Sequence, residues 1–268
     1  MTPTTTALLT DLYELTMAQA YLAQGMTDIA VFEFFVRKLP PQRNFFMAAG
    51  LEQVLNYLEE LQFSDADIAW LDQTGGFTPA TLNALRAMRL TGEVHAMPEG
   101  SLFFPHEPIL RITAPLPQAQ LVETRVMNIL NFQTMVASKA CRSVLVAGDK
   151  PLIDFGLRRA HGAEAGLLAA RAAYLAGLAG TSNVSAGARF GIPIYGTMAH
   201  SFVQAHLDEA EAFTHIAEAQ PRNVVLLIDT YDTEAAAEKV VSLAGRLNAR
   251  GISIHGVRFD SGDMADHA

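Results

Sequence analysis

Apolar residues recur with helical spacing over much of the first half of the chain and cluster as in strands between these segments. The helical spacing predicts helices over residues 7–24, 46–61, 64–72, 78–88 and 117–141. Runs rich in valine, isoleucine and phenylalanine, bounded by glycine or proline, predict strands over residues 28–40, 92–97 and 108–114. The first half is therefore expected to be a mixed α and β region.

The second half alternates regularly between strand-like and helix-like segments. Strands are predicted over residues 151–156, 177–183, 192–196, 223–229 and 252–260. Helices are predicted over residues 163–176 and 184–190, from about Ser201, and over 233–250. Such alternation indicates βαβ crossovers and a parallel sheet, either much of an α/β barrel or, as the alternative, a doubly wound open sheet. We expect an N-terminal α+β domain with a helical linker over residues 1–140 and a partial α/β barrel over 141–268.

Composition narrows the class of protein. The chain has 268 residues, half of them apolar, which is enough for one or two domains with a core. A single cysteine, Cys141, rules out a disulfide framework and points to a cytoplasmic location. The N-terminus lacks the features of a signal peptide, and the longest aliphatic run, Val224–Ile228, is too short to cross a bilayer. The net charge of −9, without a dense basic run, argues against nucleic acid or membrane as a partner.

Polar and ionisable residues collect where each predicted strand of the second half ends. They are Asp154, Arg158, Arg159, Thr181, Ser182, Asn183, Thr197, His200, Ser201, Asp229, Asp232, Arg258, Asp260, Ser261 and Asp263. In parallel α/β folds the carboxyl ends of the strands build the site. The arginines suit carboxylate or phosphate groups, and the aspartates suit Mg²⁺ or vicinal hydroxyls. The sequence thus predicts an anionic, hydroxyl-rich, phosphorylated ligand, without a standard phosphate loop or dinucleotide fingerprint.

Each of these residues taken alone also has a purely structural interpretation. His200 could cap a helix or lie in the core, and Asp229 and Asp260 could hold turns. Asp232 precedes a threonine as a helix N-cap does, and one of Arg158 and Arg159 is expected to form a surface ion pair. Only the joint pattern favours a functional site.

Eight motifs, in order and over nearly the whole chain, closely resemble the nicotinate phosphoribosyltransferase family. The motifs are TDLYELTMAQAY (10–21), FEFFVRKLP (32–40), AGLEQVL (49–55), DFGLRRAHG (154–162), GTSNV (180–184), GTMAHSF (196–202), DTYDT (229–233) and GVRFDSGD (256–263). The resemblance implies a type II phosphoribosyltransferase fold, an irregular α/β barrel joined to a β-rich domain. It also implies NAD salvage: nicotinate and phosphoribosyl pyrophosphate give nicotinate mononucleotide and pyrophosphate, with Mg²⁺ and coupled ATP hydrolysis, in a cytoplasmic homodimer with sites at the subunit interface.

The resemblance also implies roles for individual residues. His200 matches the histidine that ATP phosphorylates, and Asp229 and Asp260 lie at the phosphoribosyl site. Arg158 and Arg258 match contacts to nicotinate and phosphoribosyl groups, and Tyr13 matches a tyrosine that stacks on the pyridine ring from the neighbouring subunit. The expected substrate-binding set also contains Ser182, Thr197, Ser201 and Ser261. The resemblance leaves the metal ligands open.

Two alternatives concern substrate and activity. Nicotinamide-using relatives carry an aspartate where this chain has Ser182, which can donate to a nicotinate carboxylate; nicotinate is therefore favoured over nicotinamide, and over quinolinate. The resemblance also predicts further barrel strands beyond residue 268, so the barrel is expected to be incomplete here. The chain is then either a piece of a longer enzyme or a truncated homologue that is weak or inactive. An unrelated sugar-phosphate barrel enzyme is the remaining alternative.

Overall fold

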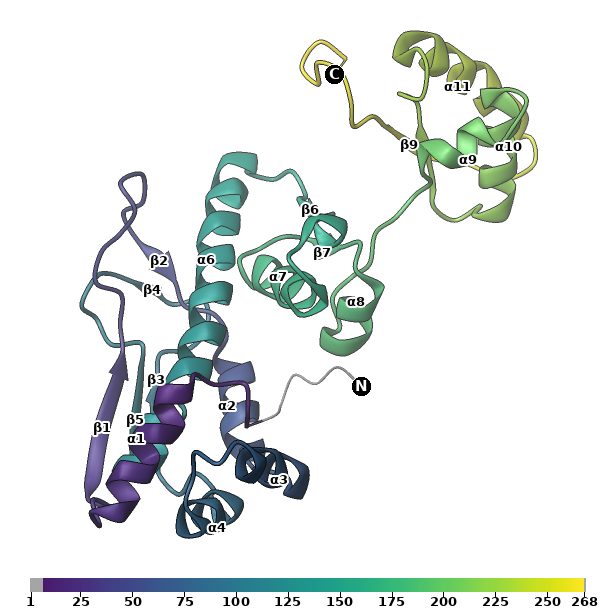
Figure 1. Cartoon of the computed structure of the whole chain (residues 1–268). Helices are drawn as coiled ribbons and strands as arrows, with labels where there is room; N and C mark the ends of the chain where they lie inside the picture. The colour runs from purple at the N-terminus through teal and green to yellow at the C-terminus, as the bar shows by residue number, and fades with distance from the viewer. Residues whose placement is uncertain (1–6, 268) are drawn as a thin grey trace. The chain divides into compact units, whose positions relative to one another are not determined.

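The computed structural model describes residues 7–267 and divides the chain into two compact units (Figure 1). The first unit runs to Ile194 and the second starts at Tyr195. This division follows compactness alone. The two units do not test the domain boundary expected after residue 140, which stays a prediction.

The first unit contains a three-stranded antiparallel sheet in the order β1-β5-β3. Its strands are β1 (Ile29–Phe34), β3 (Glu93–Ala96) and β5 (Leu110–Pro115). These agree with three of the predicted strands, with shorter bounds. A separate pair, β2 (Phe46–Met47) with β4 (Leu102–Phe103), was not predicted. Because Phe46 and Met47 pair as a strand, the helix expected from residue 46 begins only at Leu51, after Gly50 at φ 107°.

The described part of the first unit also contains six helices from α1 to α6. They are α1 (Leu12–Ala23), α2 (Leu51–Glu60), α3 (Asp65–Gln73), α4 (Pro79–Ala87), α5 (Leu116–Leu121) and α6 (Glu123–Ala147). The capping box of Ser64 and Asp67 starts α3, and Thr78 followed by Pro79 starts α4, as their residue types favour. The single helix expected over residues 117–141 is wrong in one respect: Val122 separates two helices, α5 and α6.

The first unit also holds the first two strands of the predicted barrel. β6 (Ile153–Asp154) pairs in parallel with β7 (Gly180–Thr181), and α7 (Ala163–Leu175), the one-turn η1 (Leu157–Arg159) and α8 (Val184–Phe190) complete this region. The strand expected over residues 192–196 is not formed. One parallel bridge joins Thr181 to Ile194, and Pro193 lacks the N–H that a ladder needs, although its carbonyl accepts from the Thr181 N–H at 3.0 Å.

The second unit is a parallel two-stranded sheet with helices. Its elements are α9 (His200–Gln204), α10 (Glu209–Ala219), β8 (Val224–Leu227), α11 (Thr233–Asn248) and β9 (Ile254–Arg258). Its core includes Phe213, Leu226, Leu227 and Leu243. Asp208 and Asp232 accept the N–H groups that start α10 and α11. Among the described strands no closed barrel forms, because the parallel pairs are β6–β7 and β8–β9. No described helix is long and apolar enough to span a membrane.

A half-buried ion-pair network connects α7 with the rest of the first unit. The Arg171 guanidinium donates to both carboxylate oxygens of Glu99, at 2.8 and 2.7 Å, and also contacts Glu52. Glu99 in turn accepts the N–H groups of Gly50 and Leu51 at the start of α2. Burial alone would raise the pKa of Glu99, but Arg171 and these N–H groups outweigh it and lower the pKa. The network therefore links α2 to α7.

We expect Arg171→Met to lower the free energy of unfolding of the first unit by roughly 2–3 kcal/mol, because it removes the charged partner of the half-buried Glu99 carboxylate. Arg86→Met is the matched control: it removes an exposed pair with Asp65, 49% and 92% exposed, and should cost about 1 kcal/mol or less. Trp70, the single tryptophan of the chain, lies in this unit and reports its unfolding in urea. Equal destabilisation by the two variants would contradict this account.

Candidate active site

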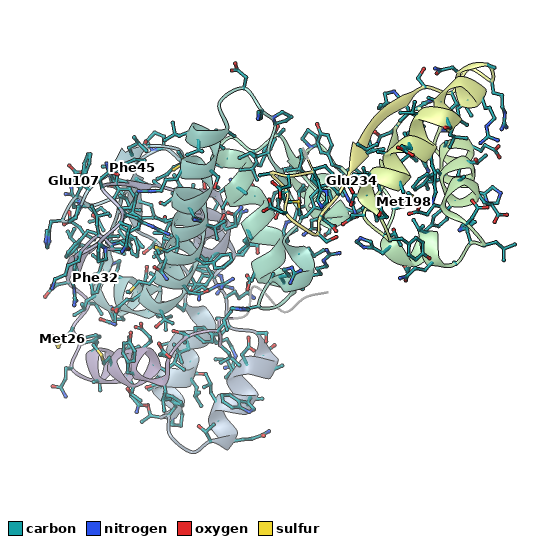
Figure 2. The ribbon with its side chains drawn as sticks, turned by 90° about the horizontal axis from the view of Figure 1, so that it is seen from above. Met26, Phe32, Phe45, Glu107, Met198 and Glu234 are labelled. Atoms are coloured by element: carbon teal, nitrogen blue, oxygen red, sulfur yellow. The ribbon has the colours of Figure 1, made fainter. Side chains whose placement is uncertain are left out.

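The second unit brings His200, Asp229 and Asp260 together. The Asp229 side chain follows β8, Asp260 follows β9, and His200 begins α9. His200 Nε2 lies 3.1 Å from Asp229 Oδ1 and 3.5 Å from Asp260 Oδ1. Figure 2 draws the side chains of this unit, with Met198 and Glu234 labelled. The expected clustering of strand-end residues is thus observed for these three.

Asp229 is the buried anchor of the cluster, with a side chain only 2% exposed. One carboxylate oxygen, Oδ2, accepts the Asp260 N–H at 2.9 Å and the Ser261 hydroxyl at 2.5 Å, while Oδ1 faces His200. Burial would raise the pKa of Asp229, but the hydrogen bonds from Ser261, Asp260 and His200 outweigh it and lower the pKa to about 2. Asp229 is therefore a carboxylate at neutral pH.

The ionised Asp229 decides the tautomer of His200. A carboxylate only accepts, so His200 Nε2 carries the hydrogen that it donates to Asp229. In the neutral ring Nδ1 then carries the lone pair, and no described residue is bonded to it. The His200 side chain is 38% exposed, so solvent reaches part of the imidazole.

Arg258 connects the end of β9 to the segment before His200. Its Nη1 donates to Thr197 Oγ1 at 2.7 Å, and its Nη2 donates to the Met198 carbonyl at 3.2 Å. Nη2 also lies 3.4 Å from Asp260 Oδ2. The buried Nε of Arg258 has no partner among the described residues, and the exposed Ser201 has no side-chain hydrogen bond among them. Arg258 thus holds the segment before His200, and its Nε–H is left without a partner among the described residues.

Some strand-end residues of the first unit have hydrogen-bond partners within the unit, and others have none among the described residues. Asp154 accepts from the Gly156 N–H at 2.9 Å and from the Thr181 hydroxyl at 2.7 Å. Asn183 caps α8 through the Ala186 N–H. These contacts give Asp154 and Asn183 structural roles, just as Asp232 has one in the second unit.

Three other side chains of the first unit have no ion-pair or hydrogen-bond partner among the described residues. Arg158 and Arg159 are exposed, and neither forms an ion pair with a described residue, so the surface ion pair expected for one of them is wrong. Ser182 is half-buried, and its hydroxyl has no partner among the described residues. Its N–H donates to the Asp154 carbonyl at 2.7 Å, which fixes its backbone. Arg158 and Ser182 are therefore free to meet a ligand.

Tyr13 lies on α1 beside a buried carboxylate that sequence analysis did not single out. Glu14 is fully buried and accepts from Gln120 Nε2 at 2.8 Å and from the Thr124 hydroxyl at 3.0 Å. Burial, the largest effect, raises the pKa of Glu14. Tyr13 is 44% exposed, and its hydroxyl donates to Glu123 at 3.3 Å. Glu14 thus holds α1 against the start of α6, and Tyr13, the next residue back, is exposed. The sequence signal for Glu14 was an acidic residue within an apolar helical pattern.

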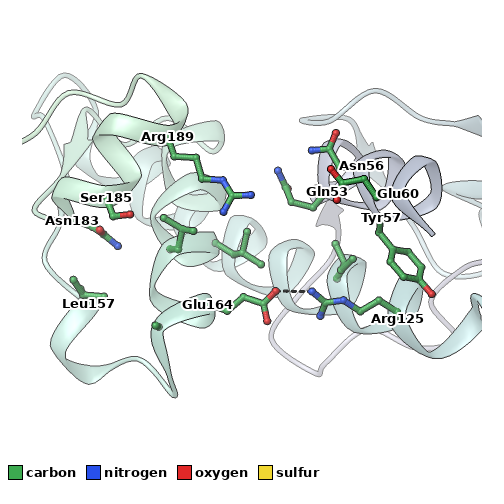
Figure 3. Close-up of a pocket in the computed structure, with 14 residues that line it drawn as sticks. Gln53, Asn56, Tyr57, Glu60, Arg125, Leu157, Glu164, Asn183, Ser185 and Arg189 are labelled. Atoms are coloured by element: carbon green, nitrogen blue, oxygen red, sulfur yellow. Dashed lines mark hydrogen bonds and ion pairs between the residues drawn. The ribbon is translucent and has the colours of Figure 1, made fainter. Parts of the chain in front are cut away.

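A cavity of about 400 Å³ lies elsewhere in the first unit, between α2 and α6 on one side and α7 and α8 on the other (Figure 3). The Arg125 guanidinium pairs with Glu164 at 2.6 Å across its floor, and Arg189 reaches from α8 toward α2. Its lining includes Leu157 and Asn183 but none of the residues expected to bind substrate or to act in catalysis. The cavity is therefore not where the chemistry-bearing residues gather.

Sequence comparisons connect this arrangement with known enzymes. The profile of the nicotinate phosphoribosyltransferase N-terminal domain matches residues 8–131, and that of the nicotinate phosphoribosyltransferase family matches residues 151–268. The chain is 50% identical over 258 residues to nicotinate phosphoribosyltransferase pncB2 of Mycobacterium tuberculosis, covering 96% of this chain and 55% of that protein. It is 43% identical to nicotinate phosphoribosyltransferase of Bacillus subtilis, covering 97% and 53%. The chain spans about half the length of the curated relatives it matches.

Solved structures agree in fold. The crystal structure of human nicotinic acid phosphoribosyltransferase aligns with a TM-score of 0.88 at 34% identity, over 96% of this chain and 62% of the human one. Nicotinate-nucleotide pyrophosphorylase from Pyrococcus furiosus aligns with a TM-score of 0.76 at 24% identity, over 96% and 57%, which shows a shared fold. The expected α/β fold of type II phosphoribosyltransferases is confirmed. The chain belongs to the nicotinate phosphoribosyltransferase family.

Proposed function

We propose that this chain carries the site for phosphoribosyl transfer to nicotinate, as the names of its relatives indicate for them. The observation that carries the proposal is the cluster of His200, Asp229, Asp260 and Arg258 at the ends of β8 and β9. The substrates are nicotinate, phosphoribosyl pyrophosphate and ATP, and the pathway is NAD salvage.

The transfer itself needs no side-chain nucleophile. The pyridine nitrogen of nicotinate attacks the anomeric carbon, and the bond from that carbon to the pyrophosphate oxygen breaks, so pyrophosphate leaves with the electron pair. Positive charge develops on the ribose, and negative charge on the leaving group. In this proposal Asp260 accepts ribose hydroxyls, and its 41% exposure supports that role. Arg158 is open for the nicotinate carboxylate or a phosphate.

His200 is the proposed acceptor of a phosphoryl group from ATP. Nδ1 attacks the γ-phosphorus, the bond to the bridging oxygen breaks, and ADP leaves. Asp229 supports this step because it holds the proton on Nε2 and stabilises the positive charge that the ring gains on phosphorylation. Later transfer of the phosphoryl group to water restores the free histidine.

The donor set near His200 accommodates Mg²⁺ through one carboxylate. Ligand atoms of His200, Asp229 and Asp260 lie within 4.8 Å of one another. Mg²⁺ prefers oxygen ligands, but both oxygens of Asp229 already accept hydrogen bonds and His200 Nε2 donates one. Asp260 therefore would hold Mg²⁺ together with substrate oxygens. Bound there, the ion would neutralise charge on the departing pyrophosphate.

Assembly and location belong to the same proposal. We propose a homodimer in which Tyr13 reaches the site of the neighbouring subunit, and its 44% exposure on α1 supports this. A cytoplasmic location is supported by the buried, unpaired Cys141, the single cysteine of the chain.

Ser182→Asp tests the choice of acid over amide. The new carboxylate would lie where we place the nicotinate carboxylate, so we expect kcat/KM for nicotinate to fall at least about tenfold through like-charge repulsion. Ser185→Asp is the matched control, with the same change three residues further along, on α8. Steady-state kinetics with nicotinate and with nicotinamide measures the effect. An unchanged ratio of the two kcat/KM values in Ser182→Asp would show that Ser182 does not contact the bound base.

Product analysis tests the function directly. The purified chain is incubated with phosphoribosyl pyrophosphate, Mg²⁺ and either nicotinate or nicotinamide, and the mononucleotide is identified by mass. We expect nicotinate mononucleotide from nicotinate and no product from nicotinamide. Preference for nicotinamide would overturn the proposal, as would a folded chain that forms no product and binds neither nicotinate nor phosphoribosyl pyrophosphate.

A further inference from the structure

Two histidines face each other on the second unit, apart from the residues assigned to catalysis. His206 follows α9, and His215 lies on α10. His206 Nε2 is 3.1 Å from His215 Nδ1, and the two ring centroids are 5.1 Å apart. His206 is half-buried and His215 is exposed. We propose that this pair binds a transition-metal cation of the zinc class.

The contacts of His206 are those that commonly orient a metal-binding histidine. Its Nδ1 donates to the Phe202 carbonyl at 2.7 Å, and its ring packs on Phe202 with centroids 4.7 Å apart. A metal-bound histidine commonly donates its other ring N–H to a backbone carbonyl, which fixes tautomer and ring orientation. The lone pair of His206 is therefore on Nε2, the atom that faces His215.

The spacing of the two nitrogens suits one shared cation. Zinc–nitrogen bonds are about 2.0–2.1 Å, so two imidazole nitrogens on the same ion lie about 2.8–3.4 Å apart for angles between octahedral and tetrahedral values. The observed 3.1 Å falls in this range. Without metal, the His215 Nδ1–H donates to His206 Nε2. Metal binding replaces that hydrogen bond with two coordinate bonds, and the Nδ1 proton passes to water or to Nε2 of the same ring.

The surroundings favour a divalent cation. Glu211 lies one helical turn before His215 on α10, and its carboxylate accepts from the Leu207 N–H at 3.3 Å beside the pair. Asp208, which caps α10, adds a second negative charge nearby. Water can fill the remaining positions at this exposed site. Two imidazoles select Zn²⁺, Ni²⁺ or Cu²⁺ over Mg²⁺, so this site differs in chemistry from the one proposed at Asp260.

A cation held here would fasten the end of α9 to α10. His200 starts α9, six residues before His206, so the bound cation would secure the helix that carries the proposed phosphoryl acceptor. Since the cation binds the folded arrangement, it should raise the unfolding temperature of the second unit as its concentration rises.

Titration calorimetry of the whole chain with zinc chloride tests the proposal. We expect one site whose Zn²⁺ affinity falls at least about tenfold in His215→Ala and in His206→Ala, since losing a ligand costs no less than losing a supporting contact. His95→Ala is the matched control, because His95 is exposed and also lies near a carboxylate, Glu93. His200→Ala reports binding at the catalytic cluster and should leave this affinity unchanged. Wild-type affinity in His215→Ala would overturn the proposal.

A second readout uses the wild-type chain first. With one equivalent of Cu²⁺ bound to the wild-type chain, electron paramagnetic resonance should show superhyperfine coupling to two imidazole nitrogens. Coupling to one nitrogen or none would overturn the proposal. Two-nitrogen coupling that persists in a folded His206→Gln chain, judged by circular dichroism, would also overturn it.

Discussion

We expect His200→Ala to abolish stimulation of nicotinate transfer by ATP and to leave the transfer without ATP largely intact. This expectation follows from the proposed roles: the transfer proceeds by alignment and charge stabilisation, while His200 Nδ1 is the proposed phosphoryl acceptor. Initial rates of mononucleotide formation, with and without ATP, measure both quantities on the same preparation. ADP release coupled to product formation should disappear in the variant.

His95→Ala is the control for this experiment, because it removes an exposed histidine of the first unit whose ring nitrogen contacts only Glu93 among the described residues. It should behave as the wild-type chain. If His200→Ala instead lost both activities to the same extent, His200 would be part of the transfer step itself and the assignment to energy coupling would be wrong.

We expect Asp229→Asn to have the second large effect, lowering both phosphorylation of His200 and the stability of the second unit. The amide nitrogen of the substituted side chain would face either His200 Nε2 or the donors from Asp260 and Ser261, so at least one contact is lost. Facing His200, it would put the ring proton on Nδ1 and block the nucleophile. By analogy with the wrong-tautomer effect in Ser-His-Asp enzymes, phosphorylation should fall on the order of 10³–10⁴-fold.

The same substitution changes the pH dependence of stability. The pKa of Asp229 is about 2 in the folded chain and has an ordinary value of 3.8. Because the folded value is the lower one, the contribution is complete above about pH 4 and is lost as the pH falls toward 2. It amounts to about 2 kcal/mol at neutral pH. Hydrogen exchange of β8 and β9 amides should show this loss in wild type, and its absence in Asp229→Asn.

Asp232→Asn is the matched control for charge. It removes a carboxylate from the same unit, but Asn caps a helix as well as Asp does. Its stability should stay near that of wild type at neutral pH. Equal destabilisation by the two substitutions would show that loss of net charge, and not the contacts of Asp229, is responsible.

Much of the second unit could be predicted from sequence because its signals are local and agree with one another. Val224–Leu227 is an apolar run, and Ile254–Arg258 lies in a segment that contains isoleucine, valine and phenylalanine. The helix between them begins at an Asp-Thr cap and ends before Gly251, at φ 75°. Parallel pairing of β8 and β9 puts their carboxyl ends at one edge, which is why Asp229 and Asp260 meet. The parallel pairing thus accounts for both carboxylates that lie beside His200.

What could not be predicted depends on contacts between distant residues. Phe46 and Met47 continue an apolar helical pattern, but pairing with Leu102 and Phe103 makes them a strand. Arg258 has the composition of an anion ligand, yet two of its donors hold Thr197 and Met198. The contact of His206 with His215 likewise needs the turn between α9 and α10, which no periodicity reveals.

Locating the phosphoryl group on the protein tests the site assignment most directly. The chain is incubated with ATP labelled at the γ-phosphate, and the label is mapped by proteolysis under alkaline conditions, in which phosphohistidine survives. We expect acid-labile label on the peptide containing His200, attached at Nδ1, absent in His200→Ala and strongly reduced in Asp229→Asn. Label on another residue, or equal labelling of wild type and His200→Ala, would contradict it.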